Sequence, residues 1–183
     1  MKSMLIKLLL VSGLLLLLGL IAVYGCSRIV IIYGVVYILI AVNEILHSLL
    51  RQVHRKRMFE QAQEQAKKLN KPLMVIGDPN NGDGSKIHGA SYSCGDICVD
   101  LTGCPTCPNG LKAKLPDGLE NIKDNSHVVF VSYVLEYVDD YKKAIDEIKR
   151  IGGDNVYALT LSPYQLTSYL YKGAKNVFFK KPF

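Results

Sequence analysis

The sequence predicts a small α/β domain with a mainly parallel sheet, preceded by N-terminal transmembrane helices. Two observations support this prediction. Two long apolar runs lie between residues 4 and 42, which is the composition expected of helices in a bilayer. From residue 71 onward, short runs rich in Val, Ile and Leu alternate with turns and one charged helical stretch. Continuous apolar strands that alternate with helices are typical of a parallel sheet covered on both faces.

Positive charge is concentrated close to the second apolar run. The 183-residue chain has a formal net charge of +6, and it is 49% hydrophobic and 21% charged, which is too apolar for a disordered protein. Residues 47–70 contain six Lys or Arg and two Glu, whereas acids and bases balance in residues 71–183. This balance argues against nucleic acid as a partner of the C-terminal part, because nucleic-acid-binding surfaces need clustered positive charge.

The first apolar run, Met4–Tyr24, is about 30 Å long as a helix, the thickness of a bilayer's hydrocarbon core. A second run, Ile29–Val42, follows a break near residues 25–28. Three interpretations are open: a cleaved signal peptide, a single span followed by an interfacial segment, and a two-helix hairpin, which we favour. Four Lys or Arg residues between positions 51 and 57 predict that the chain after them is cytoplasmic. We therefore expect a membrane anchor over residues 1–50, with the lipid bilayer as partner.

A basic juxtamembrane helix is expected over residues 51–70, and the α/β domain over residues 71–183. The segment 57–70 consists of good helix formers and is ended by Pro72. Its apolar stripe is thin, so we interpret it as a stalk. The expected strands of the domain are Leu73–Ile76, Ile97–Leu101, His127–Ser132, Val156–Leu161 and Val177–Phe179, and the expected helices are Val138–Ile151 and Tyr164–Tyr171.

Polar residues follow three of these strands. Asp78 opens a Gly/Asn-rich loop, Asp100 closes the next strand 22 residues later, and Ser132 ends the clearest strand. Ligands of open parallel sheets bind at the carboxyl ends of the strands. A glycine-containing first loop, followed about twenty residues later by a strand-end acid, is the pattern that holds a nucleoside. Three nearby side chains line a substrate pocket or begin a helix that packs on the sheet: Tyr133, Glu136 and Tyr137.

Residues 73–161 resemble a reduced class I S-adenosylmethionine-dependent methyltransferase domain, which has a Rossmann-like sheet. Three stretches carry the resemblance: VIGDPNNGDG (75–84), ICVDL (97–101) and DNSHVVFVSYVLEYVDDYKKAIDEIKRIGG (124–153). The resemblance implies S-adenosylmethionine as cofactor, with its ribose on Asp100 and with Ser132 lining the pocket. The residues that it implies for the methionine part of the cofactor are Asp78, Asn80, Gly82 and Gly84.

The chain also departs from the family pattern. Asn80 replaces the first glycine of the loop, His127 stands where the family has Asp, and the helix after the first strand is nearly absent. Two hypotheses therefore stay open. The first is a membrane-anchored methyltransferase whose acceptor is unknown. The second is a catalytically inactive pseudoenzyme that serves as an anchored structural or scaffold protein, with protein partners in a membrane-associated assembly such as a viral one.

Four cysteines lie within 14 residues: Cys94, Cys98, Cys104 and Cys107. Four sulfurs are a ligand set for zinc, but only the last two have the C-x2-C spacing of a zinc knuckle. We therefore assign no metal and keep zinc as the lesser alternative. Disulfides are expected less than zinc, because they are rare in cytosolic domains.

Overall fold

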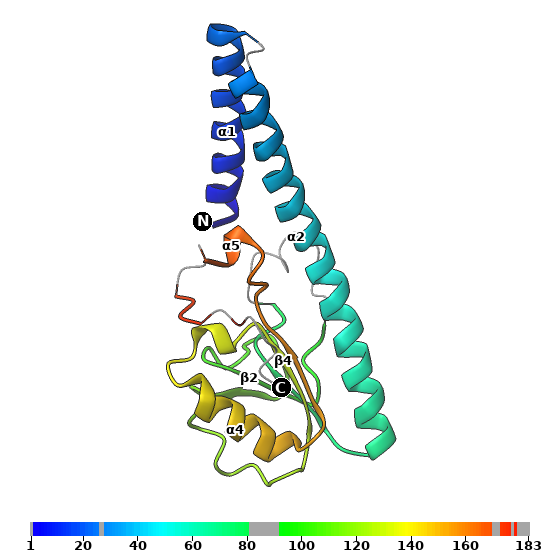
Figure 1. Cartoon of the computed structure of the whole chain (residues 1–183). Helices are drawn as coiled ribbons and strands as arrows, with labels where there is room; N and C mark the ends of the chain where they lie inside the picture. Colours follow the sequence, from blue (N-terminus) through cyan, green and yellow to red (C-terminus); the bar gives the residue numbers. More distant parts are fainter. Residues whose placement is uncertain (1, 26–27, 81–91, 170–172, 177, 179–183) are drawn as a thin grey trace.

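The computed structural model describes residues 2–25, 28–80, 92–169, 173–176 and 178. Figure 1 shows a pair of long helices that extend from a compact α/β domain. The elements, in chain order, are α1 (Lys2–Tyr24), α2 (Arg28–Leu69), β1 (Leu73–Ile76), β2 (Ile97–Asp100), β3 (Gly110–Lys112), β4 (Val128–Ser132), η1 (Leu135–Tyr137), α4 (Tyr141–Gly152), β5 (Val156–Leu159) and α5 (Leu166–Tyr169).

The helices α1 and α2 form an antiparallel hairpin, and the predicted break falls between them. Glycines allow the two helices to approach closely: a Cβ on Gly13 would lie 2.5 Å from the Tyr37 ring, and one on Gly34 would lie 3.4 Å from Leu17. Among the described residues, α2 from Val30 onward is the helix that is long and apolar enough to cross a membrane. The apolar stretch of α1 from Val11 is shorter.

Beyond the apolar stretch, α2 continues without a break and becomes one layer of the α/β domain. Phe59, Ala62 and Ala66 of this helix are buried against the sheet. The stalk interpretation is therefore wrong, because it overlooked that small alanine side chains let a helix lie close to a sheet. The expected boundary at residue 50 falls inside this single helix.

The sheet has five parallel strands in the order β3-β2-β1-β4-β5, which is a Rossmann-like arrangement. The β1 prediction agrees residue for residue, and β2, β4 and β5 are one or two residues shorter than expected. The edge strand β3 was not predicted, because Gly110–Lys112 is short and largely exposed and has no apolar run. The strand expected at Val177–Phe179 lies mostly outside the described residues.

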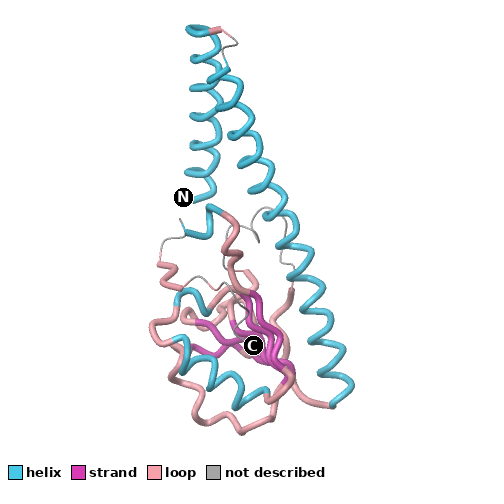
Figure 2. Tube along the Cα trace, in the orientation of Figure 1, coloured by secondary structure: helices cyan, strands magenta, loops and turns pink. Residues whose placement is uncertain are grey.

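Two helical layers cover the sheet, as Figure 2 shows. Side chains alternate along the strands: Leu73 and Val75 pack against α2, whereas Met74 and Ile76 face the α4 side. On that side, α4 buries Ala144, Ile145, Ile148 and Ile151. The α4 helix ends as its Gly-Gly sequence predicts, with Gly153 at a φ of +58° and its N–H bonded to the Lys149 carbonyl. The result is a three-layer α/β/α domain.

Candidate functional site at the carboxyl edge of the sheet

The carboxyl ends of β1 and β4 form the point at which the direction of the chain connections reverses. From β1 the chain continues to β2 on one side, whereas β4 leads to β5 on the other. Open α/β sheets bind their ligands at such a switch point. Asp78 follows β1, Asp100 ends β2 and Ser132 ends β4, so three of the predicted site residues share this edge.

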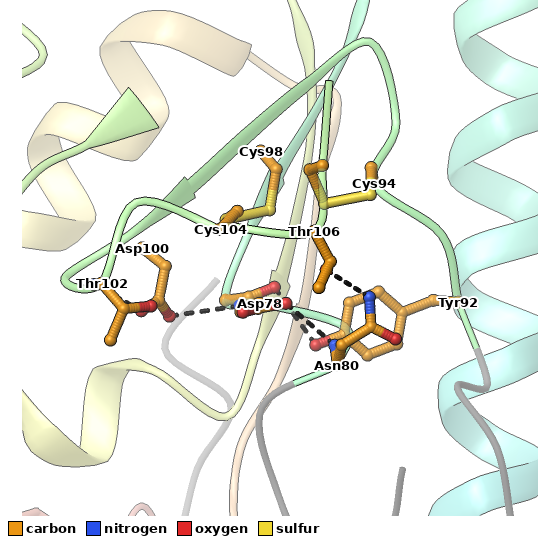
Figure 3. Close-up of a disulfide and its surroundings, with 11 residues drawn as sticks. Asp78, Asn80, Tyr92, Cys94, Cys98, Asp100, Thr102, Cys104 and Thr106 are labelled. Carbon is orange, nitrogen blue, oxygen red and sulfur yellow. Dashed lines mark hydrogen bonds between the residues drawn. A yellow bond between two sulfur atoms is a disulfide. The ribbon is translucent and has the colours of Figure 1, made fainter. Parts of the chain in front are cut away.

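Asp78 and Asp100 are in direct contact. The Asp78 backbone N–H donates to Asp100 Oδ2 at 3.1 Å, while Asp100 Oδ1 accepts from the Thr102 N–H and hydroxyl at 2.8 and 2.7 Å. Figure 3 shows this arrangement. Asp78 is buried, and its Oδ1 accepts the Asn80 N–H at 2.9 Å. The two acids therefore fix the loop that follows β1 upon the end of β2.

Asn80 connects this loop to the next one. Its Nδ2 lies 2.6 Å from Thr106 Oγ1 in the β2–β3 loop. Gly82 and Gly84, the other two predicted loop residues, lie outside the described residues.

Gly77 is a site residue that the sequence interpretation missed. Its φ is +106°, and a Cβ at this position would lie 2.9 Å from the Ser132 carbonyl oxygen. Only glycine therefore lets the ends of β1 and β4 approach so closely. The sequence did contain a signal for Gly77, because this glycine lies directly between the buried strand β1 and Asp78. Ser132 itself is buried at this crossing.

A cavity of about 460 Å³ opens beside Asp100, on the α4 side of the sheet. Its volume is within the range of small-molecule sites. Apolar side chains dominate its walls, and Asp100, Thr102, Lys114, Tyr137 and Asp139 add polar groups. The apolar lining residues are Ile76, Val99, Leu101, Ala113, Leu115, Val134 and Val138. Tyr137, one of the suggested pocket residues, thus lines this cavity, whereas Asp78 and Ser132 do not.

The opposite side of the switch point is covered by cations of α2, which the sequence interpretation treated only as a topology signal. The Arg55 guanidinium lies 4.7 Å from the Tyr133 ring centroid and 5.5 Å from that of Tyr92, and Arg51 lies 5.3 Å from Tyr133. These are cation–π distances. Tyr133 has a left-handed φ of +54°, which is uncommon for an aromatic residue and costs backbone energy.

Tyr92 is buried on this side of the site, between α2 and the end of β1. Its hydroxyl donates to the Gly77 carbonyl at 3.2 Å. Burial raises the pKa of Tyr92, and the charges of Asp78 and Asp100 act in the same direction, while Ser132 and Arg55 oppose the rise. Asp78 and Arg55 therefore both lie close enough to Tyr92 to influence its ionisation.

Glu136 is completely buried in η1. Its Oε1 accepts the backbone N–H of Leu161, which follows β5, while Oε2 has no hydrogen-bond partner among the described residues. Burial raises the pKa of Glu136 to about 7, against the opposing effects of backbone hydrogen bonds and of Arg51. Glu136 thus connects the loops that follow β4 and β5. It is not among the residues that line the cavity beside Asp100.

All four clustered cysteines are paired. Disulfides join Cys94 to Cys107 and Cys98 to Cys104, and Figure 3 shows both beside the Asp78–Asp100 contact. The sequence interpretation ranked disulfides below zinc because it assumed a cytosolic domain. The sulfurs of Cys98, Cys104 and Cys107 lie within 4.8 Å of one another. Disulfides are the form expected in an oxidising compartment, in contrast to the cytoplasmic side that the basic residues predict.

No protein-family model, no curated protein and no solved structure matches this chain. The resemblance to methyltransferases therefore rests on the three sequence stretches alone. The described structure shows a Rossmann-like parallel sheet, an arrangement that hosts many unrelated functions.

Proposed function

We propose that this chain is a membrane-anchored, S-adenosylmethionine-binding, methyltransferase-like protein. The observation that carries the proposal is the cavity beside Asp100, at the carboxyl edge of a parallel sheet and next to its switch point. The apolar lining suits a purine base, and the strand-end carboxylate suits a ribose hydroxyl.

The hydrogen bonds of Asp100 leave room for such a contact. A carboxylate has about four lone-pair sites, and two N–H groups and one hydroxyl already use three of them. Among the described residues, Oδ2 receives only the Asp78 N–H, so it retains one site. Asp100 can therefore accept one ribose hydroxyl without giving up a bond that holds the loops.

The methionine part of the cofactor carries an ammonium and a carboxylate. Asp78 offers a negative charge and Arg55 a positive charge, and both lie near Tyr92 at the switch point. The Arg55 Nε is buried and has no hydrogen-bond partner among the described residues. Neither residue lines the cavity, so a zwitterionic ligand would place its purine and ribose in the cavity and extend its methionine part past the switch point toward Asp78 and Arg55. Methyl transfer from a sulfonium requires mainly in-line placement of the acceptor, so the residues proposed here bind and orient the cofactor.

Calorimetry on the full chain in detergent micelles tests the proposal, with S-adenosylmethionine and S-adenosylhomocysteine as ligands. We expect micromolar affinity for both. Asp100→Ala removes a charged hydrogen bond of about 1.5–3 kcal/mol and should weaken binding roughly tenfold to a hundredfold. Asp154→Asn, a change at an exposed acid in the turn before β5 and so at the opposite edge of the sheet, is the matched control.

Because Asp100 also positions the loops, a second variant separates binding from folding. Leu101 is 61% exposed and lines the cavity, so Leu101→Arg should obstruct the cavity and leave the Asp100 hydrogen bonds in place. A folded full chain that shows no heat with either ligand at millimolar concentration would overturn the proposal. That result would favour the alternative of a catalytically inactive, membrane-anchored scaffold protein.

A further inference from the structure

The hairpin has a level at which both helices change from apolar to polar sequence. Gly13 of α1 lies against Tyr37 of α2, and Leu17 lies against Gly34. Six residues farther from the turn on each helix, backbone position 7 of α1 is therefore level with position 43 of α2. Position 7 is Lys, and positions 43 and 44 are Asn and Glu. Between this level and the turn, α1 is apolar for about 25 Å and α2 for about 22 Å. Large apolar side chains there are exposed on both helices, as they are when lipid surrounds them.

The segment after β5, Ser162–Tyr169, meets α2 at this level. Asn43 Nδ2 donates to the Tyr164 carbonyl at 3.2 Å, and Arg51 donates to the Gln165 side chain. Figure 1 shows α5, at the end of this segment, between the hairpin and the sheet. The Asn43 hydrogen bond satisfies the Tyr164 backbone carbonyl and holds the segment at this level of α2.

Two tyrosines of this segment are exposed although the segment is tied to α2. Tyr164 is 74% exposed and Tyr169 is 53% exposed, and the Tyr169 hydroxyl donates to the Pro163 carbonyl at 2.8 Å. Tyrosine rings are enriched where the hydrocarbon core meets the headgroups, because the ring is apolar and the hydroxyl is polar. Arg51 lies on α2 about 10 Å beyond Glu44, just outside the headgroup region, which is roughly 5–7 Å thick in each leaflet.

We propose that Ser162–Tyr169 is a second membrane contact, with Tyr164 and Tyr169 in the headgroup region of the bilayer that holds the hairpin. Because this segment follows the carboxyl end of β5 in an all-parallel sheet, the contact turns the whole carboxyl edge of the sheet, with the Asp78–Asp100 site, toward the membrane surface. The inference depends on the hairpin entering the bilayer and is independent of which ligand the cavity binds.

The chain contains no Trp, so one introduced Trp is a unique fluorescent reporter. Tyr164→Trp and Tyr169→Trp are made in the full chain and reconstituted in phosphatidylcholine–phosphatidylglycerol vesicles with brominated lipids. We expect loss of Trp emission, larger with bromines near the headgroup than with bromines near the chain ends. Val36→Trp, in the exposed apolar face of α2, should be quenched more by the deep bromines.

Asn121→Trp is the matched negative control, because position 121 is exposed in the loop before β4, at the opposite edge of the sheet. Equal quenching at positions 164 and 121 would overturn the proposal. A lack of quenching at position 36 would also overturn it, because it would show that the hairpin does not enter the bilayer. Calorimetry with S-adenosylmethionine on the same variants keeps the two proposals separate. Retained binding without quenching refutes only the membrane contact.

Discussion

Glu136 makes the stability of the α/β domain depend on pH. The pKa of its carboxyl group is 4.5 in the unfolded reference and is raised to about 7 by burial in the folded chain. Between these values the folded protein retains a proton that the unfolded chain releases, so the free energy of unfolding falls as the pH rises from about 4.5 to about 7. At about 1.4 kcal/mol per pH unit, the total loss is roughly 3 kcal/mol. Above pH 7 this contribution is constant.

Glu136→Gln removes the titration and keeps an oxygen acceptor for the Leu161 N–H. We expect the variant to be more stable than the wild type by up to about 3 kcal/mol at pH 8 and equal to it near pH 4. The urea midpoint of the full chain in nanodiscs, measured by pulse proteolysis at several pH values, provides the comparison. Glu64→Gln, at an exposed position of α2, should follow the wild type. If Glu136→Gln and the wild type lost stability in parallel between pH 4.5 and 7, burial of this carboxylate would not be the cause.

Two further variants test the structure around the site. Gly77→Ala should destabilise the domain by roughly 1–3 kcal/mol, because alanine disfavours a φ of +106° and its Cβ would meet the Ser132 carbonyl; a thermal unfolding midpoint unchanged from the wild type would contradict the close approach of β1 and β4. Cys94→Ser combined with Cys107→Ser opens a loop with a sequence separation of 13 and should cost about 3 kcal/mol in urea unfolding under non-reducing conditions. Cys26→Ser, at the remaining cysteine, is the control, and an equal midpoint for both variants would refute the pairing.

The strand pattern was predictable because buried parallel strands leave a strong local signal. Leu73–Ile76 and Val128–Ser132 are continuous apolar runs bounded by turn residues, and both form strands in the centre of the sheet. The edge strand β3 has one half-buried residue and two exposed ones, so its sequence contains no comparable pattern. Its pairing with β2 depends on backbone hydrogen bonds, which any residue except proline can make.

The site was predictable in part for the same reason. Because all strands are parallel, Asp78, Asp100 and Ser132 had to reach one edge once their strands were recognised. Arg51, Arg55 and Tyr92 were not predictable as neighbours of that edge. They come from α2 and from the segment before β2, and no local pattern states where a distant helix will pack.

The sequence by itself favoured the apolar hairpin over a single span and a cleaved signal peptide, and it predicted the mainly parallel α/β class and the edge at which the strand-end acids gather. These features follow from the period and polarity of short segments, which act over a few residues. Only the tertiary structure decided that α2 continues from the apolar hairpin into the domain as a packed layer, that the cysteines pair, and that Gly77 and Glu136 sit where β1, β4 and β5 converge. Those outcomes depend on close packing between residues far apart in the chain, and burial of a group such as Glu136 is a property of the assembled core.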